Sequence, residues 1–79
     1  MGNEQKLVAI VADVLKLDES LITDETSPSN AKNWDSFNMV QMAVKIEGAF
    51  NITITMNQLI GVTCYGDFKQ LLVKHEISL

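Results

Sequence analysis

The stretch WDSFNMVQMAVKIEGAFNITI, residues 34–54, decides the fold of this chain. Its apolar residues recur with the period of an α-helix from about Ser36 to Phe50. Asp35 comes just before that helix and suits its N-cap, because a carboxylate accepts hydrogen bonds from the unpaired backbone N–H groups of a first turn. In residues 51–55 every residue after Asn51 is β-branched, so the segment resembles a strand, but without a second strand to pair with we interpret it as an extended connector.

This helix has two apolar stripes when its residues are placed about 100° apart. The core stripe comprises Met39, Met42, Ala43, Ile46 and Phe50. The second stripe starts beside Ser36 and comprises Phe37, Val40 and Val44, with Gln41 and Glu47 on its flanks. A helix in a small bundle usually needs one buried face, so the second stripe allows two interpretations. It packs under a neighbouring loop, or it is an exposed patch that binds protein partners.

The remaining segments predict three further helices. Leu7, Ile10, Val11, Val14 and Leu15 form an amphipathic stripe that predicts a helix over about 3–17. A short helix is expected at 57–61 and a last one at about 65–76. We therefore expect an all-α fold, a small four-helix bundle in a single domain over residues 1–79.

Between the first two helices, residues 18–33 are rich in Asp, Ser, Thr and Asn and contain Pro28, the single proline of the chain. A loop this long in so small a domain is more often functional than idle. We expect Leu21 and Ile22 to pin it to the core, and Trp34 either to anchor its end or to contact partners. Met39, Met42 and Met56 are expected to fill gaps in the core.

Composition and charge exclude several classes of function. The chain contains no arginine and carries a net charge of −4, which argues against nucleic-acid binding. One cysteine and one histidine cannot build a disulfide framework or a metal site. The longest apolar run, residues 7–12, is too short to insert into a membrane, so we expect a cytoplasmic protein. The excess of acids lies in residues 18–35, which form either a well-solvated loop or a docking surface for basic partners.

Ser36 occupies a chemically special position at the start of the second helix. Free backbone N–H groups and the positive end of the helix dipole favour a phosphate at such a place. A serine that follows an N-cap aspartate is nevertheless common in helices, so these residues alone are weak evidence for a phosphate ester.

The wider pattern around Ser36 resembles the acyl carrier protein family. It consists of Trp34, Asp35, Ser36 and Phe37 at the helix start, then Val40, Met42, Ile46, Glu47 and Phe50, then residues 51–54. The family signature is Asp-Ser-Leu, an apolar-patterned helix that ends in a Glu-rich stretch, Phe, and an Asp-Ile-like pair. The resemblance covers nearly the whole chain and includes residues 65–68, Tyr-Gly-Asp-Phe, which are similar to the Val-Gly-Asp-Leu of many carriers.

The resemblance implies that Ser36 accepts a 4'-phosphopantetheine arm from coenzyme A, in a step catalysed by a separate Mg²⁺-dependent phosphopantetheinyl transferase. The thiol of the arm would then hold acyl cargo as a thioester, so the chain itself would be no enzyme. The resemblance also implies a face that binds the transferase and the acyl-loading and acyl-processing enzymes, formed by Asp35, Phe37, Val40, Gln41, Val44 and Glu47. We expect a monomer.

The chain also departs from the family pattern. Primary fatty-acid carriers have several acids along the second helix, whereas the matching positions here hold Asn38, Gln41, Gly48, Ala49 and Asn51, which leaves Glu47 alone. This difference favours a specialised carrier over one for bulk fatty-acid synthesis. An aminoacyl or peptidyl carrier, and a carrier-like interaction module that is never modified, remain alternatives. A Ser–His–acid enzyme is disfavoured, because His75 lies at the far end of the last helix.

Overall fold

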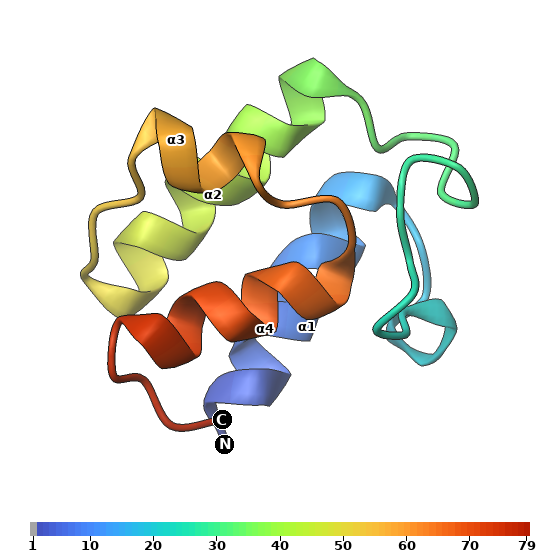
Figure 1. Cartoon of the computed structure of the whole chain (residues 1–79). Coiled ribbons are helices and arrows are strands. Elements are labelled where there is room, and N and C mark those ends of the chain that lie inside the picture. Colours follow the sequence, from blue (N-terminus) through green and yellow to red (C-terminus); the bar gives the residue numbers. More distant parts are fainter. Residues whose placement is uncertain (1) are drawn as a thin grey trace.

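Four α-helices and one short 3-10 turn make up the regular structure of residues 2–79, the part of the chain that the computed structural model describes. The helices are α1 (Asn3–Leu15), α2 (Ser36–Phe50), α3 (Met56–Ile60) and α4 (Tyr65–Lys74), and the turn is η1 (Glu19–Leu21). Figure 1 shows the short α3 beside α2 and the start of α1 close to the C-terminal end of the chain. The all-helical four-helix fold is confirmed.

The helix ends differ from the predicted ones by up to two residues, for reasons of backbone geometry. α1 ends at Leu15 instead of residue 17, because Lys16 adopts a left-handed conformation with φ of 57° and the Leu17 N–H turns back to the Ala12 carbonyl. α3 begins one residue early, at Met56, behind a Thr55 cap. α4 ends at Lys74 instead of residue 76. α2 has the predicted bounds.

The start of α2 is fixed by the predicted N-cap. Asp35 is extended, and its Oδ1 accepts the Asn38 N–H at 2.8 Å, which satisfies one of the donors that the first turn leaves unpaired. The same helix is terminated after Phe50 by its C-cap Asn51, which has a left-handed conformation with φ of 55° that asparagine tolerates better than most residues. Both ends of α2 are therefore encoded locally.

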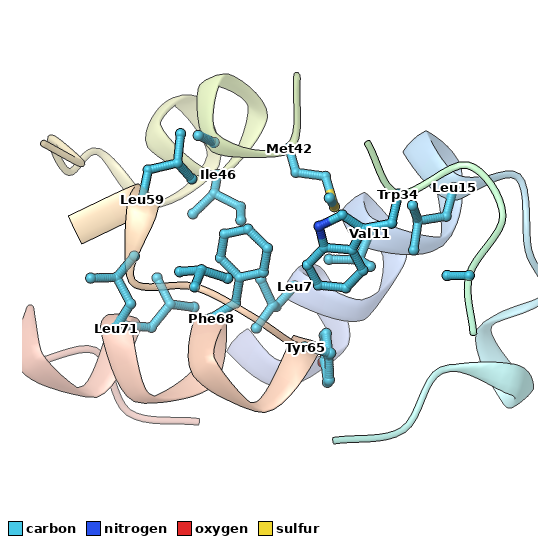
Figure 2. Close-up of a cluster of buried hydrophobic side chains, with 14 residues drawn as sticks. Leu7, Val11, Leu15, Trp34, Met42, Ile46, Leu59, Tyr65, Phe68 and Leu71 are labelled. Atoms are coloured by element: carbon cyan, nitrogen blue, oxygen red, sulfur yellow. The ribbon is translucent and has the colours of Figure 1, made fainter. Parts of the chain in front are cut away.

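The core lies between α1, α2 and α4, and Figure 2 shows its side chains meeting there. Met42 and Ile46 of the predicted core stripe are fully buried, Ala43 is nearly so, and Met39 and Phe50 are half-buried against the same cluster. The expectation for Met56 is wrong, since its side chain is 65% exposed. It is the first residue of a five-residue helix whose buried side chain is Leu59, so it points away from the core.

The long loop is held at its end by Trp34, which is 4% exposed and stacks on Phe68 with the ring centroids 6.0 Å apart. Its anchoring role is confirmed, and the indole is not exposed on the surface as a contact for partners would require. Ile22 packs against the core as expected. Leu21 does not, since its side chain is 61% exposed at the end of the η1 turn.

A second attachment joins the middle of the loop to α4. The Thr26 and Asp24 carbonyls accept the N–H groups of Tyr65 and Gly66 at 2.8 and 3.0 Å. Only glycine fits comfortably at 66, because a Cβ there would lie 3.1 Å from the Asp24 carbonyl oxygen.

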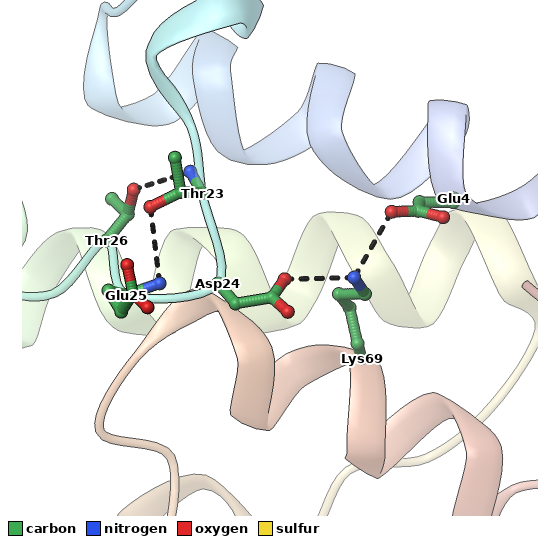
Figure 3. Close-up of polar contacts among 6 residues, drawn as sticks. All are labelled: Glu4, Thr23, Asp24, Glu25, Thr26 and Lys69. Carbon is green, nitrogen blue, oxygen red and sulfur yellow. Dashed lines mark hydrogen bonds and ion pairs between the residues drawn. The ribbon is translucent and has the colours of Figure 1, made fainter.

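The Lys69 side chain reinforces this attachment from α4. Its Nζ contacts the carboxylates of Asp24 at 2.9 Å and of Glu4 at 3.2 Å, and Figure 3 shows the lysine between the two acids. The hydrogen bonds to Asp24 and Glu4 raise the pKa of Lys69 above its usual value, and the bond to Asp24 has the larger effect. One lysine thus connects α1, the loop and α4.

Truncating a buried methionine of the core stripe is expected to destabilise the fold. Met42→Ala removes a fully buried side chain, and we expect the free energy of unfolding to fall by about 2–5 kcal/mol. Urea denaturation followed by circular dichroism measures this loss. Met56→Ala, at a 65% exposed position of the same residue type, serves as the control and should change it by less than about 0.5 kcal/mol. Equal losses in the two variants would contradict this description of the core.

The contribution of the Asp35 capping hydrogen bond to stability can be measured separately from the contribution of the Asp35 charge. Asp35→Ala deletes the acceptor of the Asn38 N–H and should lower the free energy of unfolding by about 0.5–2 kcal/mol. Asp35→Asn removes the charge but keeps a good capping oxygen, so its loss should be below about 0.5 kcal/mol. If both variants lose the same amount, the hydrogen bond is not the source of the stability.

Candidate functional site

Ser36 is the first residue of α2, and its side chain is exposed. The Asp35 carboxylate accepts the Asn38 N–H. The N–H groups of Ser36 and Phe37 belong to the first turn, where no preceding helical carbonyl can accept them. The position therefore combines an accessible hydroxyl with free donors and the positive end of a 15-residue helix.

Two asparagine side chains fix the loop that leads into this helix start. Asn38 Nδ2 donates to the Asn33 carbonyl at 2.7 Å, and Asn33 Nδ2 donates to the Leu15 carbonyl at 2.9 Å. The second bond satisfies a carbonyl in the last turn of α1, which has no helical partner of its own. The end of α1 and the start of α2 are thus linked by amide hydrogen bonds, which place Ser36 relative to the rest of the bundle.

A shallow cavity opens directly beside Ser36. Its volume is about 240 Å³, and its lining residues are Pro28, Trp34, Asp35, Ser36 and Met39. Pro28 could not be placed here from the sequence, because the path of the loop between Pro28 and Ser36 is not specified by the local pattern. The lining combines apolar surface with the serine hydroxyl.

The second stripe of α2 is exposed on the surface. The exposed fractions are 70% for Phe37, 45% for Val40 and 59% for Val44. The interpretation that this stripe packs under the loop is therefore wrong. Because the three residues follow Ser36 at helical spacing, they form an apolar strip that runs away from the hydroxyl along α2.

The flanks of this strip are less accessible than the strip itself. Gln41 is half-buried, and so is Glu47. Glu47 Oε2 accepts the Ile54 N–H at 2.7 Å, so its carboxylate holds the 51–55 connector against α2. Sequence reasoning missed this structural hydrogen bond, because the partner is a backbone group seven residues away.

Most acids of residues 18–35 are engaged in contacts within the chain. Asp18 accepts from the Ser20 N–H, which lowers the pKa of its carboxyl, and Glu19 accepts from Gln5 at 2.6 Å. Asp24 pairs with Lys69, and Asp35 caps α2. These contacts favour the interpretation of an ordered, solvated loop over that of a dedicated docking surface.

Residues 2–79 offer neither of two other kinds of site. No group of three or more His, Cys, Asp or Glu side chains there is placed to hold a metal ion. No helix in this part of the chain has the length and hydropathy needed to cross a bilayer.

Known proteins similar to this chain show the family to which it belongs. The family model described as the phosphopantetheine attachment site matches residues 5–72. An acyl carrier protein of Porphyromonas gingivalis is 33% identical over 64 residues, which cover 81% of this chain and 82% of that protein. The acyl carrier protein of Rubrobacter xylanophilus is 31% identical over 74 residues, which cover 94% of this chain and 91% of that protein.

The match to the family model spans α2 and α3 in full and most of α1 and α4, and both relatives are proteins of similar length. The chain belongs to the acyl carrier protein family, whose members carry their cargo on 4'-phosphopantetheine.

Proposed function

We propose that Ser36 is the residue to which 4'-phosphopantetheine is attached, and that residues 1–79 act as one carrier domain. The observation that carries this proposal is the exposed Ser36 hydroxyl at the start of a 15-residue helix, inside the matched region of the family model. Free N–H groups and the helix dipole at that position stabilise a phosphodiester.

The attachment step is a phosphoryl transfer from coenzyme A. The Ser36 oxygen attacks the phosphorus that bears the pantetheine arm, a new P–O bond forms, and the pyrophosphate bond to the nucleotide breaks. Adenosine 3',5'-bisphosphate leaves, and a base of the transferase takes the hydroxyl proton. The carrier contributes an accessible nucleophile on a capped helix and no catalytic group of its own.

The exposed apolar strip is proposed as the surface that enzymes recognise. Phe37, Val40 and Val44 supply apolar contact area next to Ser36, and Asp35, Gln41 and Glu47 lie on its borders. Large exposed apolar side chains that follow one another along a helix mark protein interaction sites. The partners are the phosphopantetheinyl transferase and the enzymes that load and process the acyl group.

A specialised pathway fits the charges of α2 better than bulk fatty-acid synthesis does. Glu47 is the sole acid within α2, and its Oε2 is hydrogen-bonded to Ile54. A basic partner can therefore form few ion pairs with this helix and must bind it mainly through apolar contacts. The same scarcity of acids keeps an aminoacyl or peptidyl carrier as the second candidate, which loading by adenylating enzymes distinguishes. The monomeric state and the cytoplasmic location remain predictions.

Intact-mass measurement tests the attachment residue. Incubation with coenzyme A, Mg²⁺ and a promiscuous phosphopantetheinyl transferase should add one phosphopantetheine to the wild-type chain and none to Ser36→Ala. Ser78→Ala, at another exposed serine, is the control and should be modified like the wild type. A full mass gain on folded Ser36→Ala, or none on the folded wild type, would overturn the proposal.

The apolar strip can be tested with a pair of valines that are equally accessible. Val44 of α2 and Val73 of α4 are each 59% exposed. Val44→Asp should lower kcat/KM of the transferase by about tenfold or more, as loss of a central interface contact does. Val73→Asp introduces the same charge away from the strip and should leave kcat/KM unchanged. A similar loss in both variants would point to net charge as the cause and contradict the proposed face.

A further inference from the structure

Trp34 has a buried hydrogen-bond donor that no group in residues 2–79 accepts. The residue is 4% exposed, and its Nε1 has no hydrogen-bond partner there. Buried polar groups in folded proteins almost always have partners, so each exception requires an explanation. Indole nitrogen can act as a donor only, so its partner is an acceptor from outside residues 2–79, a water oxygen or an oxygen of a bound molecule.

The position of this donor is fixed by packing. The indole stacks on Phe68 at 6.0 Å with an angle of 25° between the rings. Figure 2 shows the ring extending from the end of the loop into the core, with its nitrogen on the edge turned toward α2. Because the stack holds the ring plane, the N–H keeps this direction and cannot simply rotate to solvent.

The same residue also lines the cavity beside Ser36. Trp34, Ser36 and Met39 share that cavity of about 240 Å³. Met39 is half-buried at the cavity and Met42 is fully buried one turn further along α2. Unbranched thioether side chains adapt their rotamers readily, so the core beside the cavity can yield where these two methionines lie.

We infer that Trp34 selects cargo, and that the acyl chain it favours carries an oxygen, as a ketone or a hydroxyl on a chain carbon. This inference rests on the proposed attachment at Ser36. A chain that enters the core through the cavity meets the indole edge between α2 and Phe68. A saturated chain leaves the Nε1 proton unpartnered, whereas a chain oxygen accepts it. Sites with a buried polar group discriminate strongly against analogues that cannot pair with it.

The test uses the chain loaded with cargo of equal length. Coenzyme A analogues that carry octanoyl, 3-oxooctanoyl, 5-oxooctanoyl or 7-oxooctanoyl groups, each through a hydrolysis-resistant amide, are transferred to the ¹⁵N-labelled protein. Trp34 is the single tryptophan of the chain, so the spectrum contains one indole N–H resonance. At least one oxo chain should move the indole proton downfield and slow its exchange with deuterium, relative to the octanoyl form.

Trp34→Phe provides the second measurement. Phenylalanine keeps an aromatic ring against Phe68 but has no donor, and circular dichroism verifies its fold. In the wild type, the oxo chain that moves the resonance should also raise the thermal midpoint above that of the octanoyl form. This difference should disappear in Trp34→Phe. If that variant does not fold, the resonance of the wild type decides the question.

The two proposals fail in different ways. Absence of a mass gain on the wild type would overturn the attachment at Ser36 and the cargo inference with it. A mass gain with the same indole resonance for all four cargoes would overturn the cargo inference alone. An equal shift for all four would do so as well, because it would assign the acceptor to the pantetheine arm and not to the acyl chain.

Discussion

The stack of Trp34 on Phe68 is the contact on which the rest of the structure depends. It joins the last residue of the loop before the Asp35 cap to the middle of α4, and both rings are almost completely buried. A domain of this size buries a smaller share of its surface than a large one, so two large aromatic side chains contribute much of the available core. Because Trp34 is held inside, Asp35 and Ser36 emerge at the surface in a defined place.

The helices could be predicted from the sequence where both the apolar period and the end signals are local. α2 is such a case, since Asp35 caps its start and Asn51 ends it. α1 was predicted too long, because the turn at Lys16 depends on a left-handed residue that is neither glycine nor asparagine. Met56 was misplaced because apolar character alone does not show which way the first residue of a short helix points.

The candidate site could be predicted in part. The helical spacing predicts that the apolar strip starts beside Ser36 on α2. The exposed fractions of the strip residues then exclude packing of the strip under the loop. What the sequence could not show are contacts made across the fold. The Pro28 side of the cavity, the bond from Glu47 to Ile54 and the pairing of Lys69 with Asp24 each join segments whose approach depends on the tertiary structure.

The same contacts explain how an acidic chain can present few carboxylates that lack an internal partner. Asp24 and Glu4 share Lys69, Asp35 holds the first turn of α2, and Glu47 holds the connector. Carboxylates used in this way keep their charge but have one oxygen already engaged, so a basic partner gains less from approaching them. The side chains of the exposed strip of α2 are not engaged in this way. Its three large apolar side chains remain in water unless another molecule covers them, and an enzyme that reaches Ser36 along α2 would do so.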